Sequence, residues 1–208
     1  MEWIELQLPG ADLRIAPDFL RRQQADAVLD ALSAEIPWQC HRIRLYGREL
    51  DSPRLSCWMG EPEAVYTFSR TRFEPLPWTP TVWALKSRVE AACGGRFNSV
   101  LANLYRDGAD SMGWHADDEP ELGPQPVIAS LSLGAERRFC LRERPVRGFK
   151  SSAVAAAAPL RLAVPLPHGS LLRMAGATQA RYQHALPKST RALGPRLNLT
   201  FRLIRAAA

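Results

Sequence analysis

Several features that would assign a protein to a class at once are missing from this sequence. The four cysteines form no C-x-x-C pair and lie far apart, at Cys40, Cys57, Cys93 and Cys140. This spacing argues against a zinc ribbon or a disulfide framework, and we expect four reduced, mostly buried thiols. No apolar run approaches the ~20 residues that cross a bilayer. The N-terminus, MEWIELQLPGAD, is acidic and mixed, unlike a secretory signal. We therefore expect a cytoplasmic protein with no membrane partner.

Internal repeats and long linkers are also missing, so we expect the 208 residues to form one domain with a substantial core. The charge balance is modest. The sequence has 27 lysines and arginines against 21 acidic residues, a formal net charge of +6. A basic balance of this size is compatible with a nucleic-acid partner but does not require one.

Two segments in the first half have the spacing of amphipathic helices. In PDFLRRQQADAVLDALSAEIPW the apolar residues recur at intervals of three and four, and Pro37 ends the pattern. In TPTVWALKSRVEAACGG, Thr79 suits an N-cap, Pro80 suits the first helical position, and Gly94 supplies the C-terminal stop.

From residue 97 onward, short β-prone runs follow one another, separated by turn residues. They are FNSVLANLYR, VIASLSLG, RRFCLRER, LRLAVPL, GSLLRMAG, RYQHALP and RLNLTFRLI. The alanine-rich segment 151–159 reads as a loop between two of them. Two helices followed by many strands predict an α+β fold in which helices pack on one side of an antiparallel sandwich.

The stretch GWHADDEPE places one histidine among four acidic residues. His115 and Asp117 are two positions apart, so in an extended segment they share one face. One further histidine would complete a two-histidine, one-carboxylate set, which leaves metal positions open and suits non-haem Fe(II). His168, in a turn signature, and His184, at the end of a β-prone run, could both serve. An H-x-D pair is common by chance, so a solvated turn is the alternative.

The C-terminal run PRLNLTFRLI alternates polar and apolar residues. One face carries Arg196, Asn198, Thr200 and Arg202, and the other carries Leu197, Leu199, Phe201 and Leu203. Arginines directed into a sandwich would be costly unless an anion sits there, and arginine binds carboxylates through its planar fork. The two arginine backbones should lie about 20 Å apart, so they would bind different ends of a small dicarboxylate. A solvated strand face is the alternative.

Five segments, in this order, carry a resemblance to a known family. They are NSVLANLYRDGADSMGWHADDEPEL, PVIASLSLGAERRFCLRER, PLPHGSLLRMAG, YQHALP and RLNLTFR. Together they resemble the AlkB-type dioxygenases, which depend on Fe(II) and 2-oxoglutarate, most closely the animal AlkB homologues that repair double-stranded DNA. The resemblance covers roughly residues 40–205.

The resemblance implies one monomeric domain over residues 1–208. Helices and nucleotide-recognition hairpins would occupy 1–95, and a double-stranded β-helix, or jelly-roll, catalytic core would occupy 96–208. Fe(II) would be held by His115, Asp117 and His184, with His168 left in its turn. The residues implied for 2-oxoglutarate are Asn103, Tyr105, Arg196, Asn198 and Arg202. Arg196 would bind the distal carboxylate, and Arg202 would lie towards the metal-chelating end.

The activity implied by the resemblance is oxidative demethylation of alkylated bases in DNA, such as 1-methyladenine and 3-methylcytosine. It would consume O2 and 2-oxoglutarate and release formaldehyde, succinate and CO2. Three alternatives stay open: a demethylase directed at RNA or single strands, a nucleic-acid-binding protein without oxidase activity, and a jelly-roll metalloprotein acting on a small molecule.

A methyl group on the pairing edge of a base is accessible only if the nucleotide is flipped out or unpaired. Tyr66 and Phe68 in VYTFSR share a face and could stack on such a base, or they could be core aromatics. Asp118 and Glu119 could accept hydrogen bonds from its exocyclic amine, or they could belong to a solvated turn.

A hairpin in RIRLYGRELDSPR is a candidate for filling the gap that a flipped base leaves. In the double-strand-acting homologues an apolar–aromatic–glycine tip does so, and apolar wedges unstack duplexes in this way. Here the tip would be Leu45, Tyr46 and Gly47, with tyrosine in place of the family's phenylalanine. An exposed hairpin tip is the alternative. The flanking arginines could contact phosphates or simply be solvated, and they are Arg42, Arg44, Arg48 and Arg54.

Overall fold

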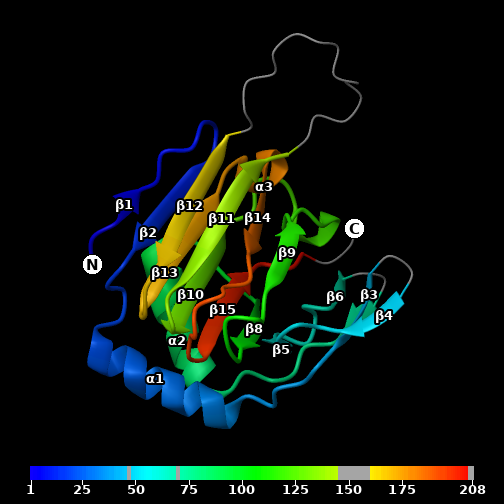
Figure 1. The fold of residues 1–208 in the computed structure, drawn as a ribbon. Helices are drawn as coiled ribbons and strands as arrows, with labels where there is room; N and C mark the ends of the chain where they lie inside the picture. The colour runs from blue at the N-terminus through cyan, green and yellow to red at the C-terminus, as the bar shows by residue number, and fades with distance from the viewer. Residues whose placement is uncertain (46–47, 69–70, 145–159, 206–208) are drawn as a thin grey trace.

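The computed structural model describes residues 1–45, 48–68, 71–144 and 160–205, and of residues 43–45, 48–49, 66–68 and 71–73 it describes the backbone alone. Two antiparallel sheets face each other (Figure 1). The larger has the order β1 (Ile4–Glu5), β2 (Asp12–Ala16), β13 (Ser170–Ala175), β10 (Ile128–Gly134), β15 (Arg196–Arg202), β8 (Ser99–Tyr105) and β5 (Leu55–Gly60). The smaller has the order β12 (Arg161–Leu166), β11 (Arg137–Glu143), β14 (Tyr182–Leu186) and β9 (Met112–His115).

The chain crosses between the sheets repeatedly from β8 onward. Strands β8, β10, β13 and β15 lie in the seven-stranded sheet, and β9, β11, β12 and β14 lie in the four-stranded sheet. This is the predicted jelly-roll core. It follows that residues remote in sequence, such as those of β9 and β14, become hydrogen-bonded neighbours.

Both predicted helices are present and lie against the seven-stranded sheet (Figure 1). Helix α1 spans Arg22–Glu35 and α2 spans Pro80–Cys93. The hydroxyl oxygen of Thr79 accepts a hydrogen bond from the amide of Val82, and Gly94 adopts a left-handed conformation with φ of 66°. The N-cap and stop predicted for α2 are therefore confirmed.

The two larger apolar clusters lie between the layers of the fold. The first packs α1 and α2 against the outer face of the seven-stranded sheet and contains Leu32, Val89, Val100 and Phe201. The second fills part of the space between the sheets and contains Phe139, Val164, Leu172 and Tyr182. One face of the central strands β10 and β15 thus packs on the helices, and the other is left to line the space between the sheets.

Each of the seven β-prone runs predicted after residue 97 forms a strand; these are β8 and β10 to β15, and β9 is an additional strand that no run indicated. The described part of the first 95 residues, however, contains seven strands that the helical spacing alone did not indicate. Of these, β1, β2 and β5 join the seven-stranded sheet, while β3 (Arg42–Leu45) pairs with β4 (Arg48–Asp51) and β6 (Tyr66–Phe68) with β7 (Thr71–Phe73). A four-residue helix, α3 (Thr178–Arg181), precedes β14 and was not predicted.

All four cysteines are free, as expected, but only two are buried. Cys57 and Cys93 lie in the core, Cys140 is partly exposed and Cys40 is exposed. No helix in the described part of the chain is long and apolar enough to span a membrane.

Candidate metal centre and anion pocket

The three predicted metal ligands meet between the sheets. His115 ends β9 and pairs directly with His184 on β14, and their ring centroids lie 4.2 Å apart. Asp117 follows two residues after His115, on the segment that leaves β9. Each side chain offers one ligand atom, and these atoms all lie within 4.8 Å of one another. The structure therefore brings together His115, Asp117 and His184, and it leaves His168 outside the group.

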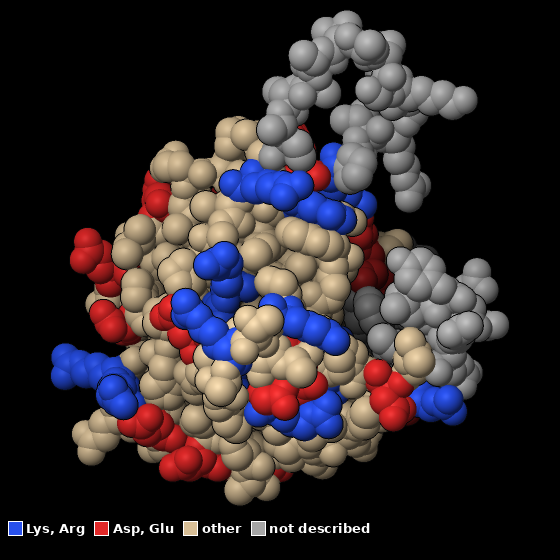
Figure 2. Space-filling view, viewed as in Figure 1, with Lys and Arg blue, Asp and Glu red and all other residues tan. Residues whose placement is uncertain are grey.

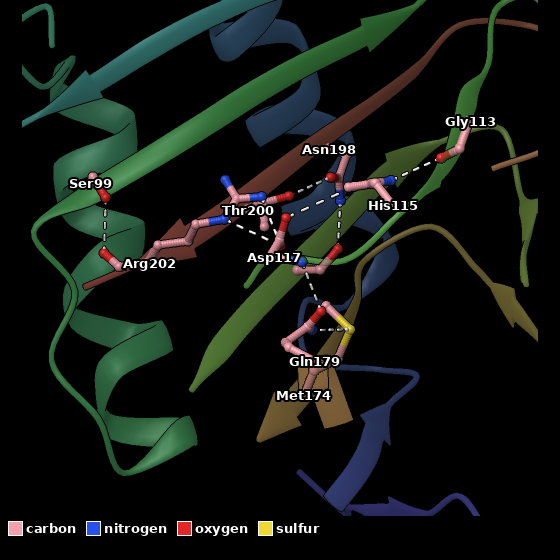
Figure 3. A network of polar contacts seen from close by, with 10 residues as sticks. Ser99, Gly113, His115, Asp117, Met174, Gln179, Asn198, Thr200 and Arg202 are labelled. Atoms are coloured by element: carbon pink, nitrogen blue, oxygen red, sulfur yellow. Dashed lines mark hydrogen bonds and ion pairs between the residues drawn. The ribbon is translucent and has the colours of Figure 1, made fainter. Parts of the chain in front are cut away.

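The carboxylate of Asp117 is paired with Arg202 of β15 (Figure 3). Its Oδ2 accepts hydrogen bonds from Arg202 Nη2 at 2.9 Å and Nε at 3.3 Å, and both side chains are buried. Burial alone would raise the pKa of Asp117, but the charge of Arg202, supported by His184 and His115, lowers it well below its usual value. Asp117 is thus an anionic ligand at neutral pH.

His184 is available as a neutral ligand. Burial, with a smaller contribution from His115, lowers the pKa of His184 to about 3. The ring of His184 also stacks on Phe139, with centroids 5.1 Å apart. Nδ1 of His115 lies 2.8 Å from the carbonyl oxygen of Gly113, which can only accept, so Nδ1 carries the proton. Nε2 of His115 is then the free nitrogen, on the side of Asp117.

Gln179 of α3 holds the backbone of the aspartate ligand. Its Oε1 accepts a hydrogen bond from the amide of Asp117 at 3.0 Å, and its Nε2 lies 3.5 Å from the sulfur of Met174 (Figure 3). Gln179 is 1% exposed, so these contacts are shielded from water. This residue was not predicted, because a lone glutamine within a four-residue helix forms no recognisable motif.

The polar face of β15 is buried, which rules out the solvated alternative. Arg196, Asn198, Thr200 and Arg202 are all 8% exposed or less, and so are the apolar residues between them. The apolar face ends one residue early, since Leu203 lies beyond the strand and is 38% exposed.

Arg196 is a buried cation with unused hydrogen-bonding capacity. Its Nη2 donates to Ser132 Oγ at 2.9 Å, and its guanidinium carbon lies 5.2 Å from the centre of the Tyr105 ring. Its Nε is buried and has no hydrogen-bond partner among the residues that the structure describes. Burial lowers the pKa of Arg196 to about 10, so it keeps its charge at neutral pH. A buried cation with an orphaned donor fits a carboxylate.

The two asparagines of the predicted 2-oxoglutarate set face each other across β8 and β15, since Asn103 pairs with Asn198 and Tyr105 with Arg196. Nδ2 of Asn198 donates to Ser130 Oγ at 2.8 Å and to the Leu131 carbonyl at 2.9 Å. All five residues of that set line one pocket together with His115, Asp117 and His184. The metal ligands and the anion-binding side chains therefore share one space.

Two further buried arginines, neither of them predicted to do so, contact residues that line this pocket: Arg54 contacts Asn103, and the guanidinium of Arg137 lies 5.9 Å from the centre of the Tyr105 ring. Arg54 had been grouped with the possible phosphate contacts, which is wrong: it is buried, and its Nε donates to Asn103 Oδ1 at 2.8 Å. Arg137 donates to the backbone carbonyls of Asp107, Asp110 and Pro187 at 2.7–3.0 Å. Its position in the alternation of β11, on the face of buried Phe139 and Leu141, was the one available signal.

The predicted base contacts are placed only in part. Asp118 is exposed and forms an ion pair with Arg144 at 2.6 Å. Glu119 is partly buried and precedes the short helix η1 (Pro120–Leu122). Tyr66 and Phe68 bound β6, with their side chains outside the described atoms. Of the predicted wedge, Leu45 ends β3, and Tyr46 and Gly47 lie outside the described residues.

Comparison with known proteins agrees with this geometry. Residues 12–202 match the 2OG-Fe(II) oxygenase superfamily. The chain belongs to this superfamily. Fe(II) and 2-oxoglutarate are thus the groups that the His–Asp–His set and the cationic pocket are built to hold.

Within the superfamily, the chain is an AlkB-type protein. It is 45% identical to alpha-ketoglutarate-dependent dioxygenase alkB homolog 3 of Mus musculus, over 90% of this chain and 64% of that protein. It is 37% identical to DNA oxidative demethylase ALKBH2 of Homo sapiens, over 97% of this chain and 77% of that protein. The chain therefore spans less than two thirds of the alkB homolog 3 sequences that it matches.

The fold has a counterpart among solved structures. The structure of OsALKBH1 superposes with a TM-score of 0.64 at 16% identity, covering 97% of this chain and 99% of that one. At this level of identity, the match supports the jelly-roll architecture and no finer similarity.

Proposed function

We propose that this protein is an oxidative demethylase of alkylated nucleobases, acting on DNA that carries 1-methyladenine or 3-methylcytosine. One observation carries the proposal: the ligand atoms of His115, Asp117 and His184 lie within 4.8 Å of one another in a pocket that also holds a buried, incompletely bonded Arg196. The names of its relatives support the choice of substrate, since ALKBH2 is called a DNA oxidative demethylase.

The chain's own residues divide the work of binding. His115, Asp117 and His184 hold the metal, and Arg202 keeps Asp117 anionic. Arg196 receives the distal carboxylate of 2-oxoglutarate, which neutralises the buried cation. Together with O2, these two bound groups supply the oxidation of an N-methyl group to N-hydroxymethyl, which leaves as formaldehyde while 2-oxoglutarate becomes succinate and CO2.

The direct test is incubation of an oligonucleotide containing 3-methylcytosine with the protein, Fe(II), ascorbate and 2-oxoglutarate, followed by mass analysis of the base. We expect cytosine, and succinate in equal amount. His184→Ala should abolish both products, whereas His168→Ala, which changes a histidine outside the ligand group, should leave them. Binding of the oligonucleotide without any loss of methyl would instead favour a nucleic-acid-binding protein without oxidase activity.

Strand preference is tested by placing the same lesion in a duplex and in a single strand. If Tyr46 fills the gap left by a flipped base, Tyr46→Ala should slow repair of the duplex and spare the single strand. Equal rates of duplex repair by the unaltered protein and by Tyr46→Ala would show that Tyr46 does not fill the gap left by the flipped base. Higher activity on methylated RNA or on single strands would assign the protein to the alternative demethylase class, and absence of affinity for any oligonucleotide would favour a small-molecule substrate.

A further inference from the structure

The outer face of the four-stranded sheet, turned away from the metal centre, carries a row of large polar and aromatic side chains. Arg142 of β11 pairs across the sheet with Arg161 of β12 and with Gln183 of β14. Trp114 of β9 directly precedes His115 and lies on the opposite face of its strand. The row thus crosses all four strands, on the reverse side of the sheet that supplies two metal ligands.

Trp114 is held in place although it is exposed. The guanidinium of Arg142 lies 4.2 Å from the centre of the Trp114 ring, within the range of a cation–π contact. Arg142 is itself fixed, because its Nε and Nη2 both donate to Gln183 Oε1, at 3.2 and 2.9 Å. Even so, 41% of Trp114 remains exposed. The result is an indole ring with a set orientation and accessible surface.

The same face carries cations that no carboxylate neutralises. Arg138 lies four residues before Arg142 on the same side of β11, about 13 Å away along the strand. Among the described residues, Arg138, Arg142 and Arg161 form no ion pair, whereas the nearby Arg144 and Arg181 pair with acidic side chains. Figure 2, viewed from the side of β11 and β12, shows lysine and arginine side chains on this face.

We propose that this outer face binds an unpaired polynucleotide strand, with one base stacked on Trp114 and phosphates at Arg138 and Arg161. A positively charged surface with an exposed aromatic platform is the arrangement that single strands require. A base in a duplex already stacks on both sides, so the indole selects an unpaired one. The inference rests on the proposed function for the presence of a nucleic acid.

The position of Trp114 links this surface to the pocket. Strand β9 is the edge strand of its sheet, so a polynucleotide on the outer face can pass around that edge to the side on which His115 and His184 lie. A nucleotide near the lesion would then be held on Trp114 while the lesion itself occupies the pocket. The surface would increase affinity for longer substrates without taking part in the oxidation.

The test is fluorescence anisotropy with a labelled, unmodified oligodeoxythymidylate and, as a second probe, a backbone of abasic sites of equal length. We expect Trp114→Ala to weaken binding of the thymidylate by about five-fold or more and to leave binding of the abasic probe unchanged. Trp114→Phe should restore part of the loss. Unchanged binding of the thymidylate, or an equal loss on both probes, would overturn stacking at this position.

A matched control comes from the opposite side of the molecule. Trp83 on α2 is 51% exposed and also contacts a cation, Lys86 Nζ, 5.0 Å from its ring. Trp83→Ala should bind both probes as the unaltered protein does. A loss equal to that of Trp114→Ala would show that any exposed tryptophan suffices, and the proposed surface would fail.

The role of the arginines is tested by the salt dependence of oligonucleotide binding. If Arg138 and Arg161 contact phosphates, the double replacement Arg138→Gln and Arg161→Gln should reduce the slope of log Kd against log salt concentration by about 0.7 per arginine. The exposed Arg14, which already pairs with Glu5, serves as control, and Arg14→Gln should leave the slope as it was. An unchanged slope in the double variant would place the phosphates elsewhere.

These binding measurements need neither a lesion nor turnover, so they separate the two proposals. Stacking on Trp114 without demethylation would support the surface and contradict the proposed function. If the protein demethylates DNA but Trp114→Ala binds the thymidylate as tightly as the unaltered protein, the proposed function would be supported and the outer-face proposal contradicted. Absence of any single-strand binding by the unaltered protein would overturn the surface in either case.

Discussion

The two ends of the pocket solve the problem of buried charge in different ways. At the metal end, Arg202 and Asp117 neutralise each other at 2.9 Å, and the carboxylate faces two histidines. At the other end, Arg196 has a hydroxyl, an aromatic ring and an orphaned Nε, but no carboxylate partner among the described residues. At the first end the two opposite charges are paired within the chain, whereas at the second the charge of Arg196 depends on a ligand for its counter-ion.

This difference teaches that the same residue type on one strand face can have opposite energetic roles. Removing Arg202 or Asp117 strands a buried charge, whereas removing Arg196 takes away a charge that had no partner. The first change should therefore affect folding and chemistry together. The second should affect co-substrate binding and spare folding.

The largest expected effect comes from removing a metal ligand. Asp117→Ala removes a ligand and leaves Arg202 buried without its anion, so we expect conversion of 2-oxoglutarate to succinate to fall by more than about 100-fold, beyond the range for outer residues of metal sites. The free energy of unfolding should fall by about 3–5 kcal/mol. Succinate assays and urea unfolding measure the two effects.

The control for this change is an exposed carboxylate. Asp26 lies 3.1 Å from His168 on the surface, so Asp26→Ala should cost no more than about 1 kcal/mol and leave turnover intact. If Asp117→Ala lost turnover but kept full stability, the ion pair with Arg202 would contribute nothing net to folding, and the contrast between the two ends would disappear.

The next effect concerns the far end alone. Arg196→Met should raise the KM for 2-oxoglutarate by about ten-fold or more, because the distal carboxylate loses its charged partner. Stability should be unchanged or slightly higher, since an unpaired buried cation is replaced by an apolar side chain. Arg196→Lys keeps the charge without the planar fork and should give an intermediate KM. Equal KM values for all three proteins would exclude Arg196 from the co-substrate site.

A smaller effect is expected from the residue that positions the aspartate ligand. Gln179→Leu removes the acceptor that fixes the amide of Asp117, and we expect metal affinity to fall by about ten-fold. Titration with Mn(II) measures this without turnover. Gln23→Leu, on the exposed face of α1, should bind Mn(II) normally. Unchanged affinity in Gln179→Leu would show that Asp117 is positioned by Arg202 alone.

The smallest effect lies in the core behind the pocket. Burial raises the pKa of both Cys57 and Cys93 to about 11, so almost no thiolate forms at pH 7, and neither thiol should react with a disulfide reagent until the protein unfolds. The exposed Cys40 should react at once, and Cys40→Ser should remove its part of the fast phase and leave only the reaction of the partly exposed Cys140. Rapid reaction of Cys57 or Cys93 in the folded protein would show that the packing around them opens readily.

Elements whose ends or faces are marked by adjacent residues could be predicted from the sequence. Thr79, Pro80 and Gly94 predicted the ends of α2 because capping depends on adjacent residues. The alternation around Arg196 predicted a strand, and the H-x-D spacing predicted two ligands on one face. The family resemblance then selected His184 rather than His168, which the spacing alone could not do.

The remaining features depend on contacts between distant residues. Gln179 approaches Asp117 across 62 positions, and Arg54 reaches Asn103 across 49. No local pattern encodes such pairs. Among the early strands, β3 and β4 pair within the segment where a hairpin was expected. In contrast, β6 and β7 have three residues each, too few to establish a period of two, and four residues cannot show the period of α3.

The ion pair beneath the metal centre also sets the denticity of its carboxylate. Oδ2 of Asp117 already accepts from two nitrogens of Arg202, and Oδ1 is the oxygen that lies towards His115. A carboxylate bound in this way offers a cation one oxygen rather than two. The three side chains would then supply a bound Fe(II) with one donor atom each, and its remaining ligands would have to be molecules that the protein does not itself provide.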